Sequence, residues 1–163
     1  MKRFWSVFLT AFVVLAPASM NAGTQAQIKP RDIVIALSIH DNVSPCLATE
    51  AIIDSMVNAD GSVGPLVIPA GKVLVITSLE WTSFGAVANT HYAFVIRNAD
   101  KQNSIVAGAG TISDGGGDMS GSLQIPTGLV IRSGMNLCTS ANNTSIGRNL
   151  AFTRLHGYFT KDE

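Results

Sequence analysis

The sequence has little charge. Asp, Glu, Lys and Arg together make up only 13% of its 163 residues, and the 11 basic side chains balance the 11 acidic ones. A nucleic-acid-binding surface needs an excess of Lys and Arg to neutralise phosphates, so we expect no nucleic-acid partner. Hydrophobic residues nevertheless account for 47% of the chain, which is too many for a disordered protein and indicates one compact domain.

Long hydrophobic runs are also missing. The longest, Phe4–Ala16, has about a dozen residues, whereas a membrane-spanning helix needs roughly 20, so we expect no membrane span. It follows Lys2 and Arg3 and precedes a stretch of small residues, which is typical of a secretory signal peptide. We therefore expect residues 1–26 to be a signal peptide and the mature protein to begin between Ser19 and Gln27. Such a protein is secreted or periplasmic and has a formal charge of −2.

Cysteine is nearly absent, since Cys46 and Cys138 are the only two. In an oxidising compartment a lone pair of cysteines is rarely left reduced, so the sequence predicts one disulfide bond, with two free thiols as the alternative. A zinc site is not favoured, because neither cysteine belongs to a CxxC or CxxxH motif.

Helix-length periodicity is missing as well. Fifteen glycines and six prolines separate short segments in which apolar and polar residues alternate. Many short strands joined by turns predict an all-β domain over residues 27–163, a two-sheet antiparallel sandwich of the jelly-roll type. The expected strands are Ile33–Ile39, Lys72–Trp81, His91–Arg97, Ser104–Ala107, Gly121–Ile125, Leu129–Ile131, Met135–Thr139 and Asn149–Thr160.

Two segments have a less certain pattern. Ala51–Val57 fits either a helical turn or an edge strand. Asn149–Thr160 changes the phase of its apolar positions, which predicts either a bulge near Thr153 or Arg154 or a strand that passes from one sheet to the other.

The segment Lys72–Trp81 is apolar on both faces over its first half. Strict alternation places one set of residues on one face: Val73, Val75, Thr77, Leu79 and Trp81. The surplus apolar surface predicts association with other copies, unless loops such as Asn98–Asp118 cover the second face.

Three segments resemble known proteins: IPAGKVLVITSLEW at 68–81, GLVIRSGMNLCTS at 128–140 and RLHGYF at 154–159. They look like a group of small secreted bacterial β-sandwich proteins of unassigned function. The closing strand is also similar to the last strand of the C1q and tumour-necrosis-factor type jelly rolls, which are trimers. The resemblance implies the sandwich fold and export, and makes a homo-oligomer, first of all a trimer, the expectation. It supplies no catalytic motif.

Catalytic and metal-binding motifs are scarce. No G-x-S-x-G is present, and His40, His91 and His156 lie singly, so we expect neither an enzyme nor a cofactor, although a Ser-His-Asp triad can still assemble in space. Asp114 and Asp118 flank three glycines and form a weak Ca²⁺ candidate, with a solvated turn as the alternative.

Aromatic residues are the remaining ligand candidates. Trp81, His91 and Tyr92 lie in two neighbouring segments, and an exposed row of this kind would stack against a sugar ring, whereas core packing is the alternative. We therefore expect a non-enzymatic exported protein that acts through self-association or a cell-surface partner. A carbohydrate-binding module is the second hypothesis, and a hydrolase the third.

Overall fold

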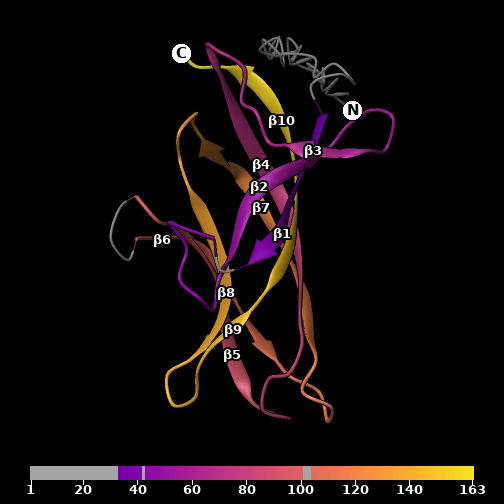
Figure 1. Cartoon of the computed structure of the whole chain (residues 1–163), viewed down its shortest axis with the longest axis vertical. Helices are drawn as coiled ribbons and strands as arrows, with labels where there is room; N and C mark the ends of the chain where they lie inside the picture. Colours follow the sequence, from indigo (N-terminus) through magenta and orange to yellow (C-terminus); the bar gives the residue numbers. More distant parts are fainter. Residues whose placement is uncertain (1–32, 42, 101–103) are drawn as a thin grey trace, which may run out of the picture.

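The computed structural model describes residues 33–41, 43–100 and 104–163, so the expected signal peptide lies outside the described residues. Ten strands make up the fold, and no helix long and apolar enough to cross a membrane occurs in these ranges (Figure 1). The strands are β1 (Ile33–Asp41), β2 (Ala51–Val57), β3 (Val63–Pro65), β4 (Lys72–Ser83), β5 (His91–Asn98), β6 (Ser104–Ile112), β7 (Met119–Ile131), β8 (Leu137–Asn143), β9 (Gly147–Leu150) and β10 (Phe152–Lys161).

All strand pairs are antiparallel, in the order β6-β5-β8-β2-β1-β10-β4-β7, with β3 added to β2 and β9 added to β8. Strand β2 connects two layers, because only Ala51 and Ile52 pair with β8 whereas most of β2 pairs with β1. One layer is β6-β5-β8-β9, and the other contains β1-β10-β4-β7. The expected all-β antiparallel sandwich is confirmed, with the two layers joined through β2 into one hydrogen-bonded sheet.

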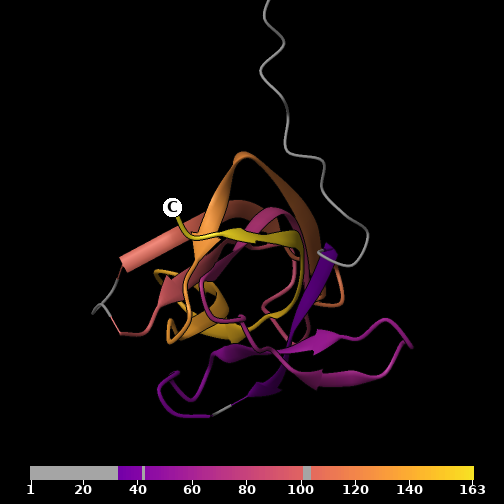
Figure 2. The same ribbon diagram turned by 90° about the horizontal axis from the view of Figure 1, so that it is seen from above.

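The sheet is nearly closed like a barrel, and Figure 2 shows the strands arranged around a common axis, with the β2–β3 hairpin projecting from them. The edge strands β6 and β7 are consecutive in the chain. They meet where Thr111 Oγ1 donates a hydrogen bond to the carbonyl oxygen of Ser120, at 3.5 Å. The last strand, β10, lies between β1 and β4, so both ends of the domain belong to the same layer and the strand order is that of a jelly roll.

The core lies between the layers and is held by apolar residues of both. Trp81 of β4 stacks on Phe94 of β5, with ring centroids 4.4 Å apart and ring planes at 7°. These two strands belong to opposite layers, so the stacking joins the layers directly. The buried cluster also contains Val34, Ala36, Ile53, Leu74, Ile76, Leu79, Ile96, Ile131, Leu137, Ala151 and Leu155.

A bulge in β4 overturns the strict alternation expected for Lys72–Trp81. Both neighbours of β4 shift register at Thr77, since its pairing with β10 and with β7 omits this residue. An extra residue reverses which face the following side chains occupy. Leu79 and Trp81 therefore share the core face with Leu74 and Ile76, and Val75 lies on the outer face.

The remaining strand predictions are confirmed with three differences. Ala51–Val57 is a strand, and it lies inside the sheet between β1 and β8 rather than at an edge. The expected segments 121–125 and 129–131 form one strand, β7. Of the two explanations for the phase change in 149–160, passage between sheets is confirmed, because β9 pairs with β8 whereas β10 pairs with β1 and β4. The bulge near Thr153 or Arg154 is wrong, because the register shift of β10 follows His156.

Candidate functional site

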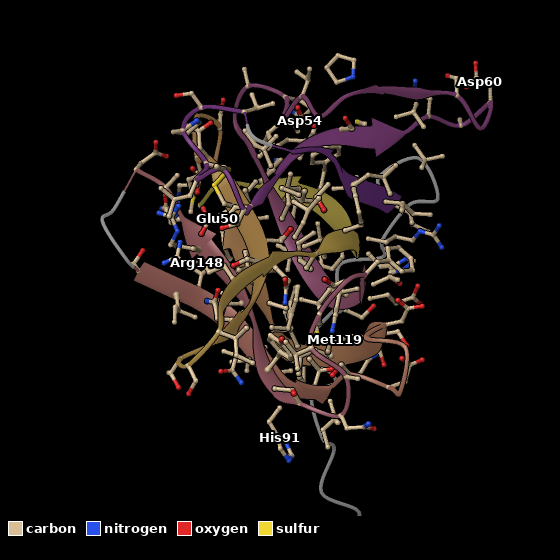
Figure 3. The ribbon with its side chains drawn as sticks, turned by 60° about the horizontal axis from the view of Figure 1, so that its bottom comes forward. Glu50, Asp54, Asp60, His91, Met119 and Arg148 are labelled. Atoms are coloured by element: carbon tan, nitrogen blue, oxygen red, sulfur yellow. A yellow bond between two sulfur atoms is a disulfide. The ribbon has the colours of Figure 1, made fainter. Side chains whose placement is uncertain are left out.

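The aromatic ligand candidates do not form a common surface. Trp81 and Tyr92 are each only 4% exposed, and both lie in core clusters. The Tyr92 hydroxyl accepts a hydrogen bond from the backbone N–H of Val87 at 3.0 Å. His91 alone is exposed, at the start of β5 (Figure 3). The hypothesis of a sugar-stacking row at these positions is therefore wrong, and the alternative, core packing, describes both buried rings.

Asp114 organises the turn between β6 and β7. Its Oδ1 accepts hydrogen bonds from the backbone N–H groups of Gly116 and Asp118, at 2.8 and 2.9 Å. These two amides lower the pKa of Asp114. Among the described residues, no third His, Cys, Asp or Glu joins Asp114 and Asp118 in a possible ligand group. Asp114 therefore stabilises the turn, and Ca²⁺ binding stays a prediction.

The predicted disulfide bond joins Cys46 and Cys138, whose Cα atoms are 5.6 Å apart. Cys46 lies in the loop between β1 and β2, and Cys138 lies in β8. The bond therefore fixes this loop on the outer side of the β6-β5-β8 layer. A disulfide is consistent with an oxidising compartment.

A buried ion cluster lies beside the disulfide. Glu50, only 1% exposed, ends the same loop, and its Oε1 accepts hydrogen bonds from Arg97 Nε at 3.1 Å and Arg148 Nη1 at 2.8 Å. Its Oε2 contacts Arg97 Nη2 and accepts a hydrogen bond from the backbone N–H of Leu47 at 3.0 Å. Figure 3 shows Glu50 and Arg148 close to the yellow disulfide. The cluster joins the loop, β5 and β9.

Opposing effects act on the pKa of Glu50. Burial raises it, whereas the hydrogen bonds from Arg97 and the Leu47 amide and the charges of both arginines lower it, and the net pKa is below the ordinary value of 4.5. The hydrogen bond to Glu50 raises the pKa of Arg97 in turn. The Glu50 carboxylate and the Arg97 guanidinium are therefore both charged near neutral pH.

The side chains of Cys46, Glu50 and Cys138 are close enough to share a metal ion. Both sulfur atoms are, however, bonded to each other, and both carboxylate oxygens of Glu50 are hydrogen-bonded to arginine or to the backbone. The disulfide-bonded form of this group has no thiolate and no free carboxylate oxygen. It therefore stabilises the loop and does not form a metal site.

The β1-β10-β4-β7 layer has an unexpected outer face. Ile33, Tyr158, Val75 and Val130 are cross-strand partners on four adjacent strands, and all four side chains point away from the core; we call them the apolar row. Ile33 is 61% exposed and Val130 is 39% exposed, while the other two are half-buried. Because neighbouring partners lie about 5 Å apart, the row forms a continuous apolar band across the layer.

Farther along the same face lies a charged group. Glu80 of β4 lies opposite Arg154 of β10, and its carboxylate oxygens are 3.9 Å from Arg154 Nη1 and 3.9 Å from His156 Nε2. His156 Nε2 is shielded from solvent and has no hydrogen-bond partner in the described part of the chain. His91 lies in the other layer, and the side chain of His40 is not described, so the described histidines do not gather at one site.

An open groove of about 320 Å³ adjoins this charged group. Its walls include the outward side chains of Leu37, Glu80, Thr82, Phe152 and Arg154. Sequence reasoning missed the groove and the ion cluster, since each joins residues from distant segments. One signal was visible in the sequence: Arg97 directly follows an apolar run in β5, and Glu50 directly precedes the apolar start of β2.

Comparison of the chain with protein-family models, curated proteins and solved structures gives no match.

Proposed function

We propose that the protein is an exported, non-enzymatic interaction protein that acts as a homo-oligomer, assembled through the outer face of the β1-β10-β4-β7 layer. The observation that carries this proposal is the apolar row. A sheet that covers a core with one face normally presents polar side chains on the other. Here the outer face presents Ile33, Val75 and Val130 together, which is the kind of surface that a partner subunit covers.

Among the described residues, the segment expected to cover this face lies elsewhere. The segment that could have covered it, Asn98–Asp118, contains β6, which belongs to the opposite layer. The disulfide-bonded loop also lies against the opposite layer, beside β8. A second copy of this chain is therefore the occupant that we propose.

Charge offers little resistance to assembly. The chain has equal numbers of acidic and basic side chains, and they make up only 13% of its residues. Copies of such a protein repel one another weakly, so apolar burial of roughly 25 cal/mol per Å² is opposed by little Coulomb energy. The apolar row supports association of copies but does not specify the number of subunits. The number three comes from the resemblance of the closing strand to trimeric jelly rolls, and export is supported by the disulfide and by the expected signal peptide.

The test is the solution mass of the disulfide-intact mature protein, measured by sedimentation and by light scattering at micromolar concentration. We expect three times the protomer mass. Val130→Glu should shift the protein towards monomer, because it places a charge in the apolar row, whereas the protomer itself keeps its core. The matched control is Val63→Glu, another exposed valine in a strand, outside the proposed interface.

A single monomeric species of the unaltered protein across the micromolar range would overturn the proposal. Dissociation that is as strong in Val63→Glu as in Val130→Glu would assign the interface to another surface. A stable dimer would keep the interface and reject the three-fold arrangement.

A further inference from the structure

We propose that the groove beside the charged group binds a neutral saccharide. It is lined on its outer side by one exposed aromatic ring, one carboxylate, one guanidinium and one hydroxyl group, from Phe152, Glu80, Arg154 and Thr82. The volume of about 320 Å³ lies within the range of roughly 300–1,000 Å³ found for small-molecule sites. This inference is independent of the proposed assembly.

The groove exists because β1 leaves the layer at this point. Strand β1 pairs with β10 from Ile33 to Ser38 and then shifts register towards β2. Phe152 at the beginning of β10 therefore pairs with Thr82 of β4 but has no partner from β1. The hollow lies where β1 has left the layer and β10, β4 and β7 remain paired. The charged and aromatic side chains of the groove belong to these paired strands, which hold them in position.

The side chains in the groove are suited to hydroxyl groups. At 3.9 Å, Glu80 and Arg154 attract each other but are too far apart for a hydrogen bond, and both side chains are more than half exposed. The carboxylate oxygens can therefore accept, and the guanidinium N–H groups can donate. Adjacent sugar hydroxyls both donate and accept, and hydrogen bonds to charged groups are the stronger kind. Phe152, which is 38% exposed, offers an aromatic face to the C–H side of a sugar ring.

The same side chains disfavour other ligands. A phosphate or another anion would be attracted by Arg154 but repelled by Glu80, which lies beside it. A purely apolar ligand would bury both charges without a hydrogen-bonding partner, which is costly. A neutral polyol satisfies both charged groups and the aromatic ring together.

The groove and the apolar row occupy different parts of the outer face. Along β4, Val75 belongs to the row, while Glu80 and Thr82 belong to the groove, with the Thr77 bulge between them. Residues five to seven positions apart along a strand are separated by about 16–24 Å. Assembly through the row thus leaves room for a ligand in the groove.

The experiment is a binding screen of the full mature protein against neutral oligosaccharides of glucose, xylose and mannose and against acidic uronic-acid oligosaccharides, followed by calorimetric titration of the strongest binder. We expect neutral compounds to bind. Phe152→Ala and Glu80→Gln should each weaken binding by about tenfold or more, because each removes one contact worth on the order of 1.4 kcal/mol. Thr82→Arg should block the groove without removing a packing contact.

Phe84→Ala is the matched control, since Phe84 is also an exposed phenylalanine but does not line the groove. It should leave binding within about twofold of the unaltered protein. Val130→Glu should also retain binding, which keeps a failure of assembly distinguishable from a failure of the groove. Binding of no saccharide at millimolar concentration, binding unaffected by Phe152→Ala and Thr82→Arg, or binding of acidic compounds alone would each overturn the inference.

Discussion

Replacing Glu50 with Gln is expected to destabilise the protein more than any change at an exposed charge. The substitution keeps the size of the side chain and removes its negative charge. Arg97, whose side chain is only 10% exposed, then loses the carboxylate that pairs with it in the described part of the chain, whereas Arg148 is 32% exposed and can turn towards water. Removing one partner of a buried ion pair typically costs about 3–5 kcal/mol, mostly through the uncompensated charge that remains. Because Arg148 can rehydrate, we expect a loss of about 3 kcal/mol.

The effect should depend on pH in one direction. The pKa of Glu50 is lower in the folded protein than its ordinary value of 4.5, so near pH 4 the unfolded chain binds more protons than the folded one. The contribution of Glu50 is therefore fully present above about pH 4.5 and is lost as the pH falls through the folded pKa. The difference in stability between the native protein and Glu50→Gln should accordingly shrink in acid.

Denaturant and thermal unfolding of disulfide-intact protein between pH 3 and pH 7 measure both quantities. At neutral pH the melting temperature of Glu50→Gln should be lower by roughly 10 °C. Glu80→Gln is the control, because Glu80 and its partner Arg154 are both more than half exposed and such pairs contribute at most about 1 kcal/mol. Equal losses in the two variants, or a Glu50→Gln deficit that does not shrink below about pH 4.5, would refute the reasoning.

Three other outcomes are expected. Reduction of the Cys46–Cys138 bond should lower the melting temperature by at least several degrees, since a loop of this length is worth nominally about 4–5 kcal/mol; alkylation of both thiols in the non-reduced native protein would exclude the bond. Gly121→Ala should cost about 1–3 kcal/mol in unfolding experiments, because its Cβ would lie 2.3 Å from the indole ring of the paired tryptophan, whereas Gly110→Ala, with no atom within 4 Å, should be tolerated. Mass spectrometry of native protein should place the first residue between Ser19 and Gln27, and an intact leader would contradict export.

Much of the strand pattern could be predicted because it is local. Alternation of apolar and polar residues located β1, β4 and β5 with small errors at their ends, and Gly, Pro, Asn and Asp marked the turns. The alternation pattern failed where the pairing with neighbouring strands determines which face a residue occupies. Thr77 is bulged because β10 and β7 both pair on either side of it, and nothing within Lys72–Trp81 reveals that.

The candidate sites could not be predicted in the same way, because each is assembled from residues far apart in the chain. The ion cluster joins Glu50, Arg97 and Arg148, and the apolar row takes one residue from each of four strands. The aromatic pattern was visible in the sequence, but alternation cannot tell which face is the core. Stacking of Trp81 on Phe94 shows that the ring lies inside.

The sequence by itself determined the class of the protein: an all-β chain of low charge density, with one cysteine pair that the structure joins as a disulfide. Composition and short-range periodicity suffice for this, since strand propensity and turn chemistry act over a few residues. Only the tertiary structure decided which side chains meet. The register of β10 between β1 and β4 places Phe152, Arg154 and Glu80 beside one groove. Register depends on the pairing of residues 70 or more positions apart in the chain.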